Sequence, residues 1–188
     1  MVPYLFKFQN MFKFYKKIFC TPKTVIDTNL LGYESVEVIG KQLETKIKKL
    51  FNGSLAIREV DAGSTNACEQ ELTALTNAYY DVERFGIHFV ASPRHADMLM
   101  VTGPVSRNMK EALIRTYKAT PDPKIVVAVG DDAISGGIFK GSYAVLDGVD
   151  KVIPVDFQIP GDPPSPKTIL CNLLKILEGV ESSNKTNR

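Results

Sequence analysis

Apolar side chains recur along the chain with two different periods. At residues 36–51 they return every three or four positions, and Asn52-Gly53 follows, so the pattern predicts a helix that ends at residues tolerant of left-handed backbone angles. From residue 55 onward, short apolar runs alternate with longer segments of helical period. The runs predict strands at 55–60, 87–91, 98–101, 124–129 and 152–157, and the segments predict helices at 66–85, 107–119 and 165–177.

Strands that alternate with helices of this length predict an α/β fold with a mainly parallel sheet covered on both faces. The chain has 188 residues, of which 44% are hydrophobic, enough for one domain with a real core. We therefore expect a domain at residues 36–179. A segment at 1–35 precedes it, and a polar tail at 180–188 follows and is expected to be disordered.

The first residues form a segment of distinct character. At residues 2–19, aromatic and aliphatic side chains recur at helical spacing, and five lysines but no acidic residue occur between residues 1 and 26. This pattern predicts a basic amphipathic helix, followed by a linker at 21–35. Contact with a membrane or a membrane subunit is the favoured interpretation, and a helix folded back on its own domain is the alternative.

Charge and targeting signals say little about partners. The net charge is +2, which gives no indication of a nucleic-acid partner. No apolar run approaches the roughly 18 residues needed to span a bilayer, and the scattered lysines do not resemble a signal peptide. We therefore expect a protein that is made and kept in the cytosol.

The three cysteines do not form a recognisable site by spacing. Cys20, Cys68 and Cys171 are far apart and no C-x-x-C occurs, which argues against a zinc knuckle and a disulfide framework. Cys171 lies among apolar residues of a predicted helix and is expected to be a core residue. Cys20 is expected to be a plain linker thiol, with lipidation as the alternative. His88 and His95 lack the third donor that a metal site needs.

Four loops should gather at one edge of the predicted sheet, because ligands of open parallel sheets bind beyond the carboxyl ends of the strands. The loops follow four of the predicted strands and span residues 61–68, 102–105, 130–137 and 160–164. They contain most of the chain's clustered Gly, Asp and Pro residues. A candidate site is therefore expected at this edge.

At these loops the chain resembles a known family. The stretches DAGSTNACEQEL, ERFGIHFVASPRHADMLMVTGPV, GDDAISGGIF and PVDFQIPGDPPSP occur in the order found in the small subunit of group 4 energy-converting, membrane-bound nickel-iron hydrogenases, which is similar to the 20-kilodalton subunit of complex I. The resemblance implies a flavodoxin-like three-layer fold and a place in a multisubunit membrane complex, at its cytoplasmic face. It also implies a partner similar to the hydrogenase large subunit or 49-kilodalton subunit, membrane-arm subunits, and possible contact with a ferredoxin-like subunit.

The resemblance also implies four positions for the ligands of a four-iron four-sulfur cluster, which cysteine thiolates hold in this family. In this sequence those positions are Thr65, Cys68, Asp132 and Asp162, so a cysteine is retained at only one of them. Carboxylate oxygens are harder ligands than thiolates and match such a cluster poorly. We therefore expect no bound cofactor and no catalytic residue, and a pocket from which the cluster has been lost.

Three functions stay open at this point. The favoured one is a structural or coupling subunit of a complex I-like or hydrogenase-like oxidoreductase complex. The second is an electron-transfer subunit of NADH-quinone oxidoreductase or hydrogenase type that keeps a cluster through Cys68 and non-cysteine ligands. The third is a metal or small-ligand module at Asp132 and Asp162, with Asp131 as a further ligand. A solvated acidic patch, or one paired with Arg94, is favoured over a metal.

Overall fold

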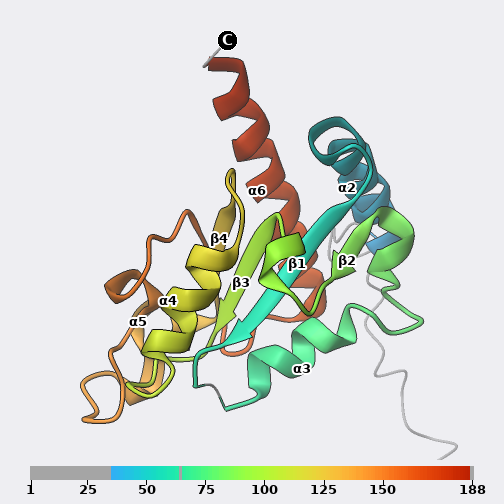
Figure 1. Ribbon diagram of the computed structural model, residues 1–188. Coiled ribbons are helices and arrows are strands. Elements are labelled where there is room, and N and C mark those ends of the chain that lie inside the picture. The colour runs from blue at the N-terminus through green and yellow to red at the C-terminus, as the bar shows by residue number, and fades with distance from the viewer. Residues whose placement is uncertain (1–34, 64, 187–188) are drawn as a thin grey trace, which may run out of the picture. The chain divides into compact units, whose positions relative to one another are not determined.

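The computed structural model describes residues 35–63 and 65–186, which build a parallel sheet of five strands with helices on both faces (Figure 1). The strand order is β2-β1-β3-β4-β5. In chain order the strands are β1 (Leu55–Asp61), β2 (Ile87–Phe89), β3 (Met98–Thr102), β4 (Ile125–Val129) and β5 (Phe157–Ile159). All neighbouring pairs are parallel, and the order is that of flavodoxin-like folds. The predicted fold class is confirmed.

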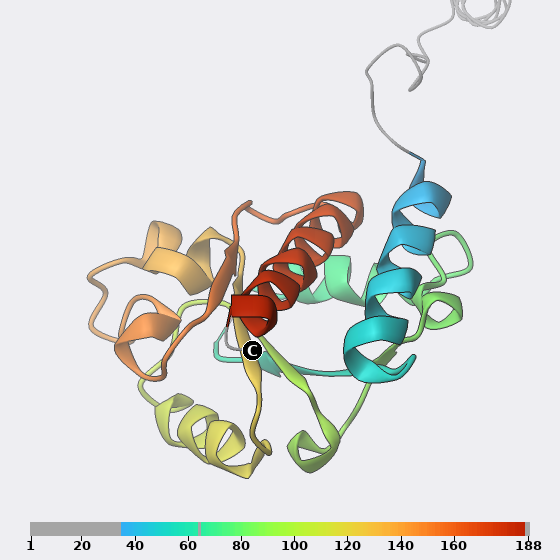
Figure 2. The ribbon, with the colours of Figure 1, turned by 90° about the horizontal axis from the view of Figure 1, so that it is seen from above.

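The helices bury the two faces of the sheet in separate cores. On one face lie α2 (Val36–Phe51), α3 (Ala67–Ala74) and α6 (Pro166–Thr186); on the other lie α4 (Lys110–Ala119) and the short α5 (Asp131–Ser135) (Figure 2). Strand β3 serves both cores, because Met98 and Met100 pack on one face while Leu99 and Val101 pack on the other. This two-sided burial explains why β3 and β4 read as continuous apolar runs.

Helix α2 begins and ends as its sequence predicts. The Ser35 hydroxyl accepts a hydrogen bond from the Val38 N–H at 3.3 Å, which caps the first turn. At the other end Asn52 has φ 54°, and its N–H donates to the Ile47 carbonyl. The buried side of the helix, which includes Leu43, packs against the core that it shares with α6.

Helix α6 continues well beyond its predicted end, to Thr186. The expectation of disorder at the start of the polar tail is therefore wrong. Glu181 is 8% exposed, and its carboxylate accepts a hydrogen bond from Lys46 Nζ at 2.6 Å and another from Lys49 Nζ. Both lysines belong to α2, so the last turns of α6 are held by a helix more than 130 residues away in sequence.

The prediction of one long helix at residues 66–85 is also wrong. Helix α3 ends at Ala74, and a 3₁₀ helix, η2 (Val82–Phe85), follows after a stretch of turns. Asn77 explains the break, because its side-chain oxygen accepts hydrogen bonds from the N–H groups of Tyr79 at 2.8 Å and Tyr80 at 3.0 Å. Asn side chains compete in this way with helical hydrogen bonds. Gly86, the residue directly after the predicted helix end, has φ 85° and ends η2.

The last strand lies later than predicted. Residues 152–155 do not pair in the sheet; they follow the 3₁₀ helix η5 (Val149–Lys151), and Ile153 packs in the core beneath α4 and α5. Pairing begins at Asp156, which exchanges two hydrogen bonds with Val126: its N–H donates to the Val126 carbonyl, and its carboxylate accepts from the Val126 N–H at 2.8 Å. The apolar residues at 152–155 belong to a loop, so apolar character alone does not show where the strand begins.

The predicted amphipathic helix at residues 2–19, the linker at 21–35 except its last residue, and Cys20 lie outside the described residues. Within residues 35–63 and 65–186, no helix combines the length and the apolar character needed to cross a membrane.

Candidate functional site

The four loops at the carboxyl ends of the strands do meet at one edge of the sheet. The Ala62 N–H, after β1, donates to the Thr102 carbonyl at the end of β3. The loop after β4 binds the loop after β5 in both directions: the Asp131 N–H donates to the Gly161 carbonyl at 2.9 Å, and the Gly161 N–H donates to Asp131 Oδ1 at 3.0 Å. The four loops are therefore hydrogen-bonded in two pairs at the edge where the sequence predicts a site.

Cys68 lies at the centre of this edge, in the first turn of α3, with 7% of its surface exposed. Its thiol rests against the backbone of Gly130 at the end of β4. A Cβ built on Gly130 would lie 2.5 Å from the Cys68 sulfur, and Gly130 has φ 90°. Both the space and the backbone angle therefore require glycine at this position.

The surroundings of Cys68 keep it as a thiol. Burial raises the pKa of the Cys68 thiol to about 12, and the neighbouring carboxylates of Glu69, Asp132, Asp162 and Asp131 add to the rise. Burial acts because the charged thiolate is poorly solvated, and the carboxylates act because they repel a further negative charge. At neutral pH this sulfur is therefore protonated.

Asp132, at the third position implied for a cluster ligand, is buried without full hydrogen bonding. It is 8% exposed, and its Oδ1 has no hydrogen-bond partner. The side chain folds against Gly137. Burial raises the pKa of Asp132, and Asp162 and Asp131 raise it further, whereas a hydrogen bond from the Ile138 backbone opposes the rise. The surroundings of Asp132 therefore make its carboxylate harder to ionise than an exposed aspartate.

Thr65 and Asp162, at the first and fourth positions, are both exposed. Asp162 lies near enough to Asp132 and Cys68 to raise the pKa of each. The predicted proximity of Asp132 and Asp162 thus agrees with the electrostatics of the site. Within the described part of the chain, no three His, Cys, Asp or Glu side chains are arranged to hold a metal ion.

The residues present do not fit a four-iron four-sulfur cluster. Such a cluster needs several thiolates, and Cys68 is the one sulfur among the four positions implied for its ligands. Carboxylates occupy two of the other positions, and they add negative charge where an anionic cluster with thiolate ligands would need compensation. The buried Asp132 turns toward Gly137 in its own loop.

Pairing of the acidic loops with Arg94, one of the alternatives for this patch, is not found among the described ion pairs. Arg94 is exposed in the 3₁₀ helix η3 (Pro93–His95). Three residues later, the Asp97 carboxylate accepts a hydrogen bond from the Ala56 N–H at the start of β1. This places the SPRHAD motif near the amino ends of the strands, opposite the edge that carries Asp132. His95 lies in the same 3₁₀ helix, exposed, and His88 lies in β2.

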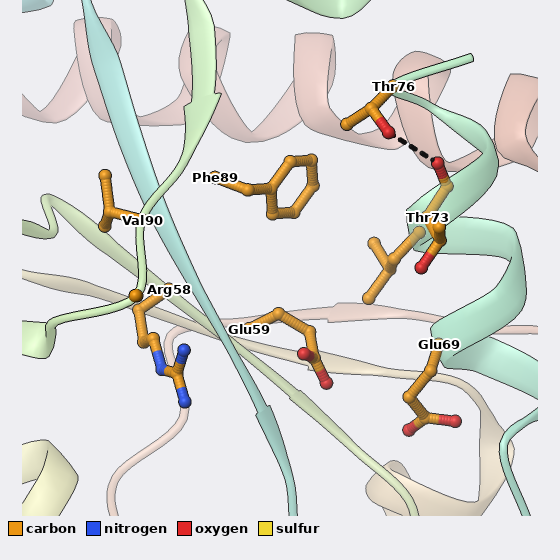
Figure 3. A pocket seen from close by; sticks show the side chains of 9 residues that line it. Arg58, Glu59, Glu69, Thr73, Thr76, Phe89 and Val90 are labelled. Carbon is orange, nitrogen blue, oxygen red and sulfur yellow. Dashed lines mark hydrogen bonds between the residues drawn. The ribbon is translucent and has the colours of Figure 1, made fainter.

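A pocket beside this edge was not anticipated from the sequence. It lies between β1, α3 and the segment that leaves β2, and has a volume of about 320 Å³ (Figure 3). Its lining includes Glu59 of β1 and Glu69 of α3, together with Arg58 and the Phe89 ring. The one sequence signal was the pair Arg58-Glu59, two successive charged residues inside an otherwise alternating strand.

The flavodoxin-like strand order, with the loops after β1, β4 and β5 gathered at one edge, is the fold that the resemblance to α/β subunits of complex I and nickel-iron hydrogenases implies. Comparison with known sequences agrees. The profile of the family described as NADH ubiquinone oxidoreductase, 20 Kd subunit, matches residues 66–176, and the chain belongs to this family.

Two relatives and one solved structure illustrate the family. The chain is 44% identical over 141 residues to the "Probable membrane-bound hydrogenase subunit mbhJ" of Pyrococcus furiosus, covering 73% of this chain and 84% of that protein. It is 41% identical over 170 residues to a subunit of the NADH-quinone oxidoreductase of Bacteroides thetaiotaomicron, covering 85% of this chain and 86% of that protein. It also matches a chain in the structure of the membrane-bound sulfane sulfur reductase, an archaeal respiratory membrane complex, with a TM-score of 0.62, 37% identity and coverage of 74% and 75%.

Proposed function

We propose that this protein is a structural or coupling subunit of a membrane-associated oxidoreductase complex of the complex I or energy-converting hydrogenase type, and that it carries no electrons through a cluster of its own. Its relatives are subunits of such complexes. Family membership supports the place in a complex, and the chemistry of the carboxyl edge supports the absence of electron transfer.

The observation that carries the proposal is the set of side chains at the four positions implied for cluster ligands. Cys68 supplies the one sulfur, and the other three positions are Thr65, Asp132 and Asp162. A ligand set of one thiol, one hydroxyl and two carboxyls does not match the soft donors that the cluster requires.

The partners follow from the proposed place in the complex. The carboxyl edge of the sheet would face a subunit similar to the hydrogenase large subunit or the 49-kilodalton subunit. The basic segment before residue 35 would face the membrane arm, which puts the domain at the cytoplasmic face as a peripheral subunit. A missing cluster would interrupt any electron path through this chain, so its role would be to transmit contact between neighbouring subunits.

Restoring the missing ligands tests this interpretation of the pocket. The variant Thr65→Cys/Asp132→Cys/Asp162→Cys and the wild-type chain are each incubated anaerobically with iron and sulfide, then desalted. The variant should become brown and retain about four irons per chain, as expected for a cluster with four cysteine ligands. The wild-type chain should retain almost none.

A matched control separates restored ligands from cysteines in general. A variant with three cysteines at exposed positions outside these loops, Glu83→Cys/Lys110→Cys/Glu178→Cys, should stay as poor in iron as the wild type. A wild-type chain that takes up about four irons and loses them on Cys68→Ala would overturn the proposal, and would establish the electron-transfer function instead.

A further inference from the structure

Two large apolar side chains project from the loop that follows α5. Ile138, in the 3₁₀ helix η4 (Gly137–Phe139), is 83% exposed, and Tyr143 is 90% exposed. No other large hydrophobic side chain within residues 35–63 and 65–183 is as exposed. Because α5 begins directly after β4, this loop lies at the carboxyl edge of the sheet (Figure 1). Apolar side chains that gather on one exposed loop are typical of an interaction surface.

The backbone of this loop is held by hydrogen bonds at both residues. The Ile138 N–H donates a hydrogen bond to the buried Asp132 carboxylate. The Tyr143 carbonyl accepts a hydrogen bond from Arg107 Nε at 2.6 Å, and the Ala144 carbonyl accepts one from the Arg107 N–H at 2.9 Å. A loop that is already fixed loses less conformational freedom on binding, so the cost of ordering these side chains against a partner is low.

Carboxylates without a paired cation lie beside the loop. Asp131 and Asp162 are exposed, and both raise the pKa of Asp132. None of the ion pairs within residues 35–63 and 65–183 includes these three carboxylates. The exposed cations of the same loops, Arg107 and Lys140, are not paired with them either. A surface that brings Lys or Arg to this edge would therefore be attracted to it.

These charges favour a protein partner over a membrane or a second copy of this chain. A membrane surface with anionic lipids would repel the carboxylates. In a symmetric dimer both copies present the same surface, so Asp131 and Asp162 of one copy would face those of the other. Like charges that meet in this way oppose association. The partner that fits is a protein surface with apolar and basic character.

We propose that Ile138 and Tyr143 anchor another subunit of the complex, which supplies an apolar depression for the two side chains and a Lys or Arg beside Asp131 and Asp162. This inference rests on the proposed function, because the partner belongs to the same complex. Tyrosine is frequent among the residues that contribute most to binding, and adjacent opposite charges fix the orientation of the two proteins.

Cross-linking in the native complex locates the partner. A tagged full-length chain carries the photoreactive residue benzoylphenylalanine in place of Ile138, Tyr143 or Lys118. Lys118 is the control, because it is exposed in the last turn of α4, toward the opposite end of the sheet. After irradiation, mass spectrometry identifies the linked peptides. We expect the first two positions to link to one and the same subunit, and the control position not to link to that subunit.

Substitution then separates the apolar anchors from the charges. Ile138→Ser and Tyr143→Ser should each speed the dissociation of that subunit about tenfold or more, whereas Tyr79→Ser, at a 71% exposed tyrosine outside the loop, should leave it unchanged. Asp131→Asn/Asp162→Asn should also speed dissociation at low salt. In that variant added salt should accelerate dissociation less than in the wild type, because salt screens the charges that have been removed.

The matched control for charge is Glu83→Gln/Glu178→Gln, which removes two exposed carboxylates outside these loops and should behave as the wild type. A chain that copurifies with other subunits but links to none of them from positions 138 and 143, or links there only to another copy of itself, would overturn this inference and leave the proposed function standing. A chain that copurifies with no other subunit would overturn both.

Discussion

Two buried carboxylates of this protein have pKa values shifted in opposite directions. Glu181 of α6 and Asp132 of α5 are both 8% exposed. The pKa of Glu181 is lowered to about 2, first by its hydrogen bonds from Lys46 and Lys49, whereas the pKa of Asp132 is raised, first by burial and then by Asp162 and Asp131. Equal burial with different partners therefore shifts the two pKa values in opposite directions.

The difference distinguishes an ion pair that joins two helices from a candidate functional site. At the junction of α2 and α6, two lysines compensate the buried charge and join the ends of two helices. At the carboxyl edge, no cation is paired with Asp132 among the described residues, and the surrounding groups are carboxylates and a thiol. The same edge carries the positions at which the family resemblance implies cluster ligands. The carboxylate without a paired cation therefore lies at the edge where the resemblance implies the cluster ligands.

The largest expected effect concerns the contact beneath Cys68. Gly130→Ala places a Cβ 2.5 Å from the Cys68 sulfur at a backbone angle, φ 90°, that side chains rarely adopt. We expect it to lower the free energy of unfolding by about 3 kcal/mol. Chemical denaturation measures the loss.

Gly141→Ala is the matched control. Gly141 has φ 76°, but nothing lies within 4 Å of a Cβ built there, so this variant should lose only about 1 kcal/mol. Equal losses in the two variants would mean that backbone strain alone acts, and that Cys68 is not packed against Gly130.

The second prediction tests the ion pairs between Glu181 of α6 and the two lysines of α2. Glu181→Gln should lower Tm by about 3–5 °C at neutral pH, while Glu178→Gln, an exposed substitution on the same helix, should change it little. Because the pKa of Glu181 is lowered from 4.5 to about 2, its stabilisation is present above pH 4.5 and is lost as pH falls toward 2. Thermal unfolding of both chains between pH 2 and 7 should show the difference shrinking on the acid side. A constant difference would contradict the ion pairs.

The third and smallest effect has the opposite sign. The pKa of Asp132 is raised above its usual 3.8, so folding favours the protonated form, and stability is lost as pH rises through the folded pKa. Asp132→Asn should therefore raise Tm by about 2 °C at neutral pH and have no such benefit below pH 3.8. The same thermal scans measure it. A decrease in Tm at neutral pH would show that the carboxylate is stabilised by a partner.

The predictable parts of the fold were those whose signal is local. Helix α2 has a cap, an apolar side and a left-handed end within its own sequence, and β3 and β4 are apolar throughout because both faces are covered. The errors arose where distant groups decide. The end of α6 depends on Lys46 and Lys49 of α2, and β5 begins where Asp156 meets Val126. The break after α3 did have a local signal, Asn77, which helical periodicity concealed.

The site divides in the same way. The meeting of four loops follows from parallel strands, because their carboxyl ends share an edge. The residues at the positions implied for cluster ligands, Thr65, Cys68, Asp132 and Asp162, could be read from the sequence. The position of Arg94 away from that edge could not be predicted. A motif at the amino ends of the strands cannot be distinguished in sequence from one at the carboxyl ends. The Glu59 and Glu69 pocket was missed because α3 brings Glu69 beside β1 only in three dimensions.

The most direct test of the central claim is the iron and acid-labile sulfide content of the native complex, purified anaerobically and compared with the complex in which this chain carries Thr65→Cys/Asp132→Cys/Asp162→Cys. The account predicts that the variant complex gains about four irons per copy of this chain, with a new signal in low-temperature electron paramagnetic resonance after reduction. Equal iron in the two complexes, with about four irons lost from the native one on Cys68→Ala, would contradict it.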